Sequence, residues 1–156
     1  MTSLDDTPLQ QLPFGLLLTA PDGRVLWVND VLCRMLGRPA DQLTDEQKSF
    51  IQARFFDINP KIIARFARYQ EIAADRANWE SWDEATWRDL QVLFNLAWTD
   101  PDWLAGEPLA GLVARERDYA EEDKIVVLEA HAELVAAVIP LHKRLQDEGQ
   151  IEITMT

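Results

Sequence analysis

The residues best suited to chemistry in this chain are its aromatic and carboxylate side chains. Six tryptophans occur among 156 residues. Flat aromatic rings can stack on sugar rings, although a tryptophan at helical spacing usually packs in a core. Trp87 and Trp98 fall on one strongly apolar helical segment, and we assign them to the core. Trp79, Trp82 and Trp103 fall in polar connections and are the candidate ligand-binding aromatics.

Metal and nucleophile chemistry finds less support in the sequence. His131 and His142 are the two histidines, and along a helix they would be separated by roughly 16 Å, too far to share a metal ion. The single Cys33 provides neither an internal disulfide nor a cysteine metal site. The run Glu121-Glu122-Asp123 is typical of a first helical turn, where acidic groups favour the helix dipole. We therefore assign no metal ligand, no cofactor and no catalytic residue.

The net charge limits the classes of partner that the chain could bind. A net charge of −12 disfavours nucleic acid and anionic membranes, since both require clustered Lys and Arg. The sequence shows no apolar run of about 20 residues and no secretion signal at its start, so we predict a cytoplasmic protein without a membrane span.

Turn and capping residues divide the chain into elements. Ala20-Pro21-Asp22-Gly23 predicts a β-hairpin over 14–28, followed by a short helix over 30–36. From Thr44 onward, capping patterns predict helices over 44–56 and 60–72, with a shorter one around 109–113. Between them, the run Ser81-Trp82-Asp83-Glu84 predicts a capping box whose helix continues to Trp98. A long helix over 123–147 follows, capped by Asp118 with Glu121.

The long helix organises the expected fold. Its apolar stripe consists of Leu128, Ala132, Val135, Ile139 and Leu145, and this stripe would suit the core or a second copy of the chain. Pro140 predicts a kink or break near residues 136–139. The alternating run Gln150-Ile151-Glu152-Ile153-Thr154-Met155 predicts a strand.

These elements predict an α+β fold that is mostly α. The hairpin and the C-terminal strand would form a small sheet packed against a helical array. We expect a loose N-terminus over 1–12, a hairpin and helix over 13–43, and a helical segment with its terminal strand over 44–156, together forming one folded unit.

Residues 39–156 resemble an internal segment of the family 57 glycoside hydrolases, the α-amylase, glucanotransferase and branching-enzyme group. The matching stretches are Phe55-Phe56-Asp57, Arg65 to Gln70, Asp89 to Val92 with Phe94 to Trp98, Glu121 to Lys124, and Leu145 to Thr154. The resemblance implies α-glucan as a partner and places Glu152 and Gln150 near a sugar site.

The resemblance does not extend to the regions of that family that carry its catalytic carboxyl groups. Retaining hydrolysis needs two carboxyl groups about 5 Å apart, and the regions that carry them in the family have no counterpart in these residues. The resemblance thus implies a non-catalytic piece, whether truncated, recombined or designed, that binds glucan or assembles with a partner. Enzymatic activity stays open, with the missing regions weighing against it.

Residues 12–43 resemble the first part of a PAS sensor domain. The resemblance rests on Leu12 to Gly15, Asp22 to Val25, Val28-Asn29-Asp30 and Leu36 to Leu43. Leu32 stands where light-sensing relatives have an Asn before their flavin-reactive cysteine, so we expect Cys33 to be an inert thiol. The alternative function is therefore a PAS-like sensor or protein-interaction module, with a five-stranded sheet around a cavity.

Overall fold

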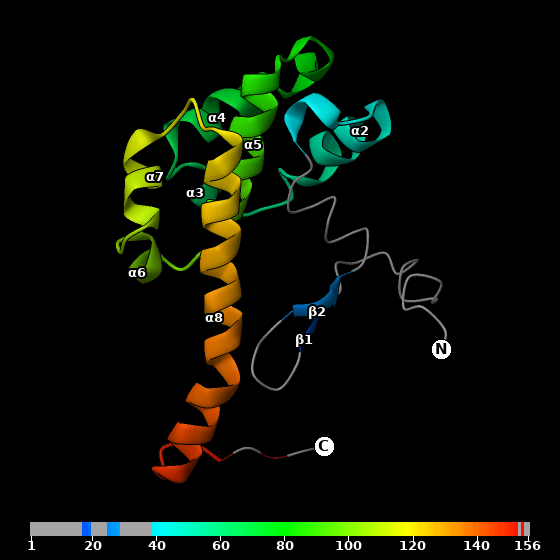
Figure 1. The fold of residues 1–156 in the computed structure, drawn as a ribbon. Coiled ribbons are helices and arrows are strands. Elements are labelled where there is room, and N and C mark those ends of the chain that lie inside the picture. Colours follow the sequence, from blue (N-terminus) through cyan, green and yellow to red (C-terminus); the bar gives the residue numbers. More distant parts are fainter. Residues whose placement is uncertain (1–16, 20–24, 29–38, 153, 155–156) are drawn as a thin grey trace, which may run out of the picture.

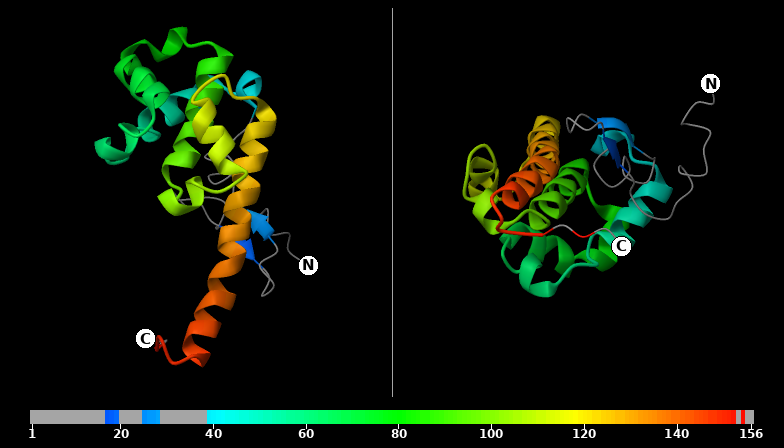
Figure 2. Two further views of the ribbon diagram at one scale, coloured as in Figure 1. Left: turned by 90° about the vertical axis from the view of Figure 1, so that its left-hand side faces the viewer. Right: turned by 90° about the horizontal axis from the view of Figure 1, so that it is seen from below.

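The computed structural model describes residues 17–19, 25–28, 39–152 and 154. Short helices gather around α5 (Glu84–Ala97), as Figure 1 shows. One long helix, α8 (Glu121–Asp147), lies along α5 and then extends past the other helices (Figures 1 and 2). The described chain is therefore a helical body with a helical arm.

Capping side chains fix where the first helices begin. The Thr44 hydroxyl accepts from the Gln47 N–H at 3.3 Å, and the Gln47 side chain accepts from the Thr44 N–H at 3.0 Å, so α2 (Asp45–Arg54) opens with a capping box. The Asn59 side chain accepts from the Lys61 N–H at 2.9 Å at the start of α3 (Pro60–Ile63). Both predicted helix starts are confirmed, because each depends on local hydrogen bonds alone.

The prediction of one continuous helix over 60–72 is wrong, because the structure has two helices there. Phe66 is 4% exposed and has extended backbone angles (φ −123°, ψ 112°), which separate α3 from α4 (Ala67–Ala74). The 3-10 helix η4 (Arg76–Ser81) then leads to α5. The N-cap of α5 is Asp83, whose carboxylate accepts from the Thr86 N–H at 2.8 Å, in place of the predicted cap at Ser81, which belongs to η4.

Helix α5 is the buried centre of the body, as its apolar sequence predicts. Trp87, Leu90 and Leu93 are each at most 1% exposed. The assignment of Trp98 to the core is wrong, because its side chain is 61% exposed just beyond the last turn. It retains an edge contact with Phe94, with ring centroids 6.2 Å apart.

Polar groups attach the remaining helices to α5. Asp89, which is buried, accepts from Arg68 Nε at 2.8 Å and from the Tyr119 N–H at 3.1 Å. Glu121 accepts from Arg88 Nε at 2.9 Å and from the Ala40 N–H at 3.0 Å. These contacts connect α4, α5 and α8 with the 3-10 helix η3 (Ala40–Gln42). The helices α6 (Pro101–Leu104) and α7 (Leu109–Arg115) complete the body.

The long helix differs from expectation at its start and on its packed face. Its N-cap is Ala120, whose N–H donates to the Asp123 carboxylate at 2.7 Å, in place of the predicted cap at Asp118. The α8 residues that are buried are Asp123, Lys124, Val127 and Ala130. As a core stripe the prediction is therefore wrong: all of its members except Leu145 lie to one side of the packed face, and Val135 and Ile139 are exposed.

Pro140 does not break α8. The helix is continuous from Glu121 to Asp147 with this proline inside it. A proline removes one backbone donor, and here it falls in the exposed half of the helix, where water can reach the backbone.

The predicted sheet is wrong. Gly149, with φ 71°, turns the chain back on the end of α8, and the N–H groups of Gln150 and Ile151 both donate to the Leu145 carbonyl. Backbone donors that close a helix end cannot pair with a strand. Accordingly, residues 151, 152 and 154 adopt no strand structure, while Ile153 and Met155 lie outside the described residues.

Two very short segments pair with each other near the N-terminus. β1 (Leu17–Thr19) and β2 (Val25–Val28) run antiparallel, with Leu18 opposite Trp27 and an irregularity after Leu18. In the described part of the chain this pair is joined by no third strand. The intervening turn, the predicted helix over 30–36 and Cys33 lie outside the described residues.

Candidate functional site

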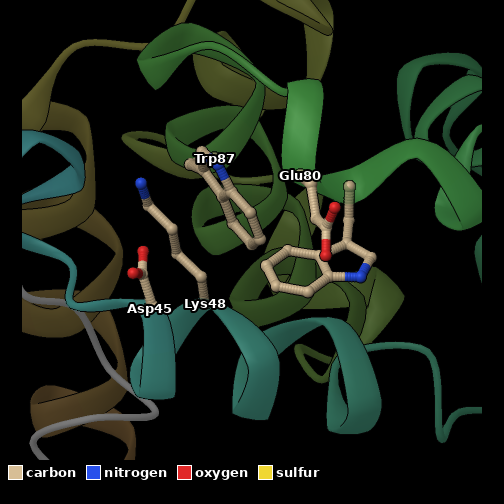
Figure 3. Close-up of a pocket in the computed structure, with 5 residues that line it drawn as sticks. Asp45, Lys48, Glu80 and Trp87 are labelled. Atoms are coloured by element: carbon tan, nitrogen blue, oxygen red, sulfur yellow. The ribbon is translucent and has the colours of Figure 1, made fainter.

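A concavity between α2 and α5 is the candidate site. It is lined by Asp45 and Lys48 from α2, Trp79 and Glu80 from η4, and Trp87 from α5. Its volume is about 310 Å³, at the lower end of the range for small-ligand sites. Figure 3 shows Lys48 rising from α2 toward the Trp87 ring, with Glu80 on the other side of that ring.

Tryptophan rings form the apolar part of this site. The rings of Trp79 and Trp87 meet edge to face, with centroids 6.2 Å apart, and the Trp82 ring also meets Trp87 edge to face, with centroids 4.9 Å apart. Trp87 is buried, whereas Trp79 and Trp82 are half-buried. The three rings therefore fix one another, and the two outer ones retain exposed surface.

Hydrogen bonds hold the segment that carries the outer rings. Asp75 accepts from Trp82 Nε1 at 2.8 Å and from the Asn78 side-chain amide at 2.6 Å. The bonds from Asn78 and from Trp82 lower the pKa of Asp75 below its ordinary value. An ionised Asp75 therefore orients the Trp82 indole, which packs against Trp87.

Charged groups line the polar side of the concavity. Lys48 Nζ lies 6.0 Å from the centre of the Trp87 ring, within range of a cation–π contact. Asp45 stands one helical turn earlier on α2, in the first turn fixed by the Thr44 cap. The site thus combines aromatic surface with an ammonium donor and the Asp45 and Glu80 carboxylate acceptors.

A second concavity adjoins the first. It shares Lys48 and Trp87 and is otherwise lined by Trp82 with residues 83–85, and its volume is about 440 Å³. Asp83 is engaged as the α5 cap, and its hydrogen bonds with the Thr86 hydroxyl and N–H lower its pKa. The Lys48 side chain therefore lies on the boundary between the two concavities.

The structure brings together two of the five residues predicted from sequence. Trp79 and Trp82 both contact the Trp87 ring. Trp103 is 46% exposed on α6 and lines neither concavity. Gln150 and Glu152 are exposed beyond the far end of α8, remote from the helical body (Figure 1). The Gln150 side chain there donates to Glu148 at 2.9 Å.

Sequence reasoning missed the other lining residues. Trp87 was assigned to the core, which is correct, but one part of its ring also faces the concavity. Asp45 and Lys48 are ordinary polar residues of an amphipathic helix. Their spacing of three on one face of α2 was the available signal, and it has meaning only once α2 is known to pack beside η4.

The described residues offer no metal-binding group of three or more His, Cys, Asp and Glu side chains. His131 Nε2 lies 2.8 Å from the Thr99 hydroxyl, and His142 Nδ1 lies 2.7 Å from the Val138 carbonyl. Within the acidic run, Asp123 pairs with Arg115, while Glu121 pairs with Arg88 and Lys124.

At the N-terminal end of α8, the pKa values of Glu121 and Lys124 are shifted from their ordinary values. Burial would raise the pKa of Glu121, but hydrogen bonds from Lys124, Ala40 and Arg88 outweigh it, and the net pKa is lowered. Burial lowers the pKa of Lys124, and the neighbouring Glu121 opposes that effect. These groups anchor α8 to the body and are engaged with one another.

One helix of the described chain is long and apolar enough to cross a membrane. In the apolar window of α8, 11% of the residues are buried in the protein. The sequence-based expectation of a cytoplasmic protein without a membrane span stays a prediction, since length and composition alone do not place a helix in lipid.

Comparison with protein-family models, with curated proteins and with solved structures finds no match for this chain. The resemblances to glycoside hydrolases and to PAS domains therefore stay interpretations of the sequence. Any functional argument depends on the geometry of the concavities around Trp87.

Proposed function

We propose that this chain is a non-catalytic α-glucan-binding module related to the family 57 glycoside hydrolases. The observation that carries the proposal is the concavity in which Trp79 and Trp87 adjoin Asp45, Lys48 and Glu80. Sugar rings present apolar C–H faces and a rim of hydroxyl groups. Aromatic surface bordered by hydrogen-bonding groups complements both features.

The sequence resemblance supports glucan as the ligand class. The resemblance covers residues 39–156, and every residue lining the two concavities falls in that range. The proposal is limited to binding, because the concavities are described by their aromatic and charged lining and no residue is assigned a catalytic role. Binding is expected to be weak, with Kd near 1 mM, since the volume admits about one or two sugar rings.

Native affinity electrophoresis in gels containing soluble starch tests the proposal. We expect starch to retard the wild-type chain, and Trp79→Ala to weaken binding at least about fivefold, corresponding to ~1 kcal/mol. Glu80→Ala, a change at an exposed rim residue, should also weaken binding without disturbing the core. Circular dichroism would verify that both variants keep their helices.

Trp103→Ala is the matched control, because Trp103 is an exposed tryptophan outside the concavities. It should be retarded like the wild type. Wild-type migration unaffected by starch would refute the proposal. Loss of retardation in Trp103→Ala but not in Trp79→Ala would move binding to another face and refute this site.

A further inference from the structure

The free half of α8 carries an apolar seam that continues the seam packed in the body. Lys124, Val127 and His131 lie on the face directed at α5, and His131 contacts Thr99 just after α5 ends. Spacings of three and four continue this face as Leu134, Val138, Leu141 and Leu145. This alternation is the heptad pattern of a helix that packs lengthwise on another helix.

The described body leaves the middle of this continuation exposed, whereas Leu134 and Leu145 are half-buried. Val138 and Leu141 are 44% and 42% exposed, and neighbouring Ile139 is 70% exposed. The segment from residue 132 to residue 147 is about 24 Å long and projects beyond α2–α7 (Figures 1 and 2). An apolar helix face of this length in water favours association.

We propose that the α8 seam, meaning Leu134, Val138, Leu141 and Leu145, binds the same seam of a second copy of the chain in an antiparallel pair. The second α8 would occupy, beyond the end of α5, the position that α5 occupies in the body. The interface therefore continues an established helix–helix contact.

The spacing of the seam suits a two-fold axis. An axis passing between residues 139 and 140 places Leu134 level with the second copy's Leu145, and Val138 level with the second copy's Leu141. Four apolar layers result, and each residue has an apolar counterpart, as a self-complementary interface requires. Pro140 lies on the opposite side of the helix from Val138, so it does not interrupt the seam.

The body selects the antiparallel direction. In a parallel pair, the second α8 would have to follow the seam into the part already occupied by α5. In the antiparallel pair, the two bodies lie at opposite ends. A seam of four apolar layers makes a smaller interface than stable complexes have, so we expect the dimer to be weak and reversible.

Sedimentation velocity from about 10 μM to about 1 mM, the range where weak complexes dissociate, tests the association. We expect the mean mass to rise toward twice that of the chain. Val138→Glu should leave a monomer across the range, because it places a charge in the central layers. Ala136→Glu, which introduces the same charge on the opposite helix face, should still dimerise at the upper end of this range.

Cysteine cross-linking tests the direction. In a Cys33→Ser background, Val138→Cys should be joined to itself by a short bismaleimide, because the two positions lie near the axis. Leu145→Cys should not, since an antiparallel pair separates the two positions by about 16 Å along the helices. Cross-linking of both variants would indicate a parallel pair and overturn the proposal.

Other occupants of the seam give distinct results. A chain that stays monomeric at every concentration overturns the proposal. So does a monomer that floats with phosphatidylcholine vesicles, because lipid would then cover the seam. A dimer that persists in Val138→Glu places the interface elsewhere and also overturns it. None of these outcomes depends on glucan binding, so failure here leaves the Trp79 site to its own test.

Discussion

Asp89 is the least exposed charged side chain in the described part of the protein, at 1%. Its carboxylate accepts from Arg68 Nε at 2.8 Å and from the Tyr119 N–H at 3.1 Å. Removing Arg68 leaves a buried charge with reduced compensation. We expect Arg68→Met to lower the free energy of unfolding by about 2 to 4 kcal/mol, measured by urea denaturation.

An exposed ion pair provides the matched control. Arg54 pairs with Asp57 at 3.3 Å, and both side chains are more than half exposed. Arg54→Met should therefore change stability by less than about 0.5 kcal/mol. Equal losses in the two variants would show that burial of Asp89 does not determine the effect.

His131 makes stability depend on pH. Burial lowers its pKa below the unfolded value of 6.5, so the folded protein binds fewer protons than the unfolded chain just below pH 6.5. Stability should consequently fall as pH is lowered through that region. The carboxylates with lowered pKa, such as Glu71 and Glu121, add their own loss only nearer pH 4.

Urea denaturation at a series of pH values between 5 and 7.5 would measure this effect, in the window where histidine titrates. We expect the wild-type free energy of unfolding to rise with pH, and His131→Gln to flatten that rise. His142→Gln is the control on the exposed half of the same helix. A slope unchanged in His131→Gln would contradict the assignment.

At the scale of elements, the Thr44 cap positions one wall of the candidate site. Helix α2 carries both Asp45 and Lys48, and its first turn is closed by the reciprocal bonds of Thr44 and Gln47. Thr44→Ala should lower the free energy of unfolding by about 1 kcal/mol. It should also weaken starch retardation if the proposed site is correct, because the α2 wall would fray.

Ser49→Ala is the control that distinguishes loss of the cap from loss of any hydroxyl group in α2. Ser49 is exposed in the middle of α2, where alanine has the higher helix propensity. This change should leave stability unchanged or slightly raised. A loss similar to that of Thr44→Ala would show that the cap is not the cause.

Sequence patterns predicted those elements whose limits depend on neighbouring residues. The cap at Thr44 and the Asn59-Pro60 start are confirmed because their hydrogen bonds span two or three residues. The strand after Gly149 was wrong because alternation of apolar residues does not specify a pairing partner. In the structure, the Leu145 carbonyl binds that backbone first.

The candidate site could be predicted only in part, namely where its residues are marked by their neighbours in the sequence. Polar surroundings in the sequence single out Trp79 and Trp82, and both of these residues contact Trp87. The contribution of α2 depends on packing between segments about 30 residues apart along the chain, which no local pattern records. The exposure of Trp98 also follows from packing, since α5 ends one residue earlier than the apolar run.

At the scale of the whole molecule, the structure separates a packed body from a projecting arm. The body is closed by the buried faces of α5 and by the Asp89 and Glu121 contacts. The arm repeats the packed face of α8 without a described partner. A residue change on the arm should therefore affect association, whereas one in the body should affect folding.

The charge of the molecule provides a further test of what holds two copies together. Each copy carries a net charge of −12, so two copies repel each other, while the proposed seam residues are apolar. Raising NaCl from about 0.05 to about 0.5 M shortens the screening length from roughly 14 to roughly 4 Å. We expect the dimer to become tighter, because screening weakens the repulsion and leaves apolar burial little changed.

Sedimentation at fixed protein concentration across this salt series would measure the change. Ala136→Glu, which adds one charge outside the seam, should require somewhat more salt than the wild type to reach the same dimer fraction. A dimer that dissociates as salt rises would instead be held by ion pairs between the two copies, for which Lys143 and Arg144 would have to exchange their present partners, Asp147 and Glu148 of the same helix. That result would contradict an apolar α8 seam, because burial of uncharged side chains has no attraction for salt to screen.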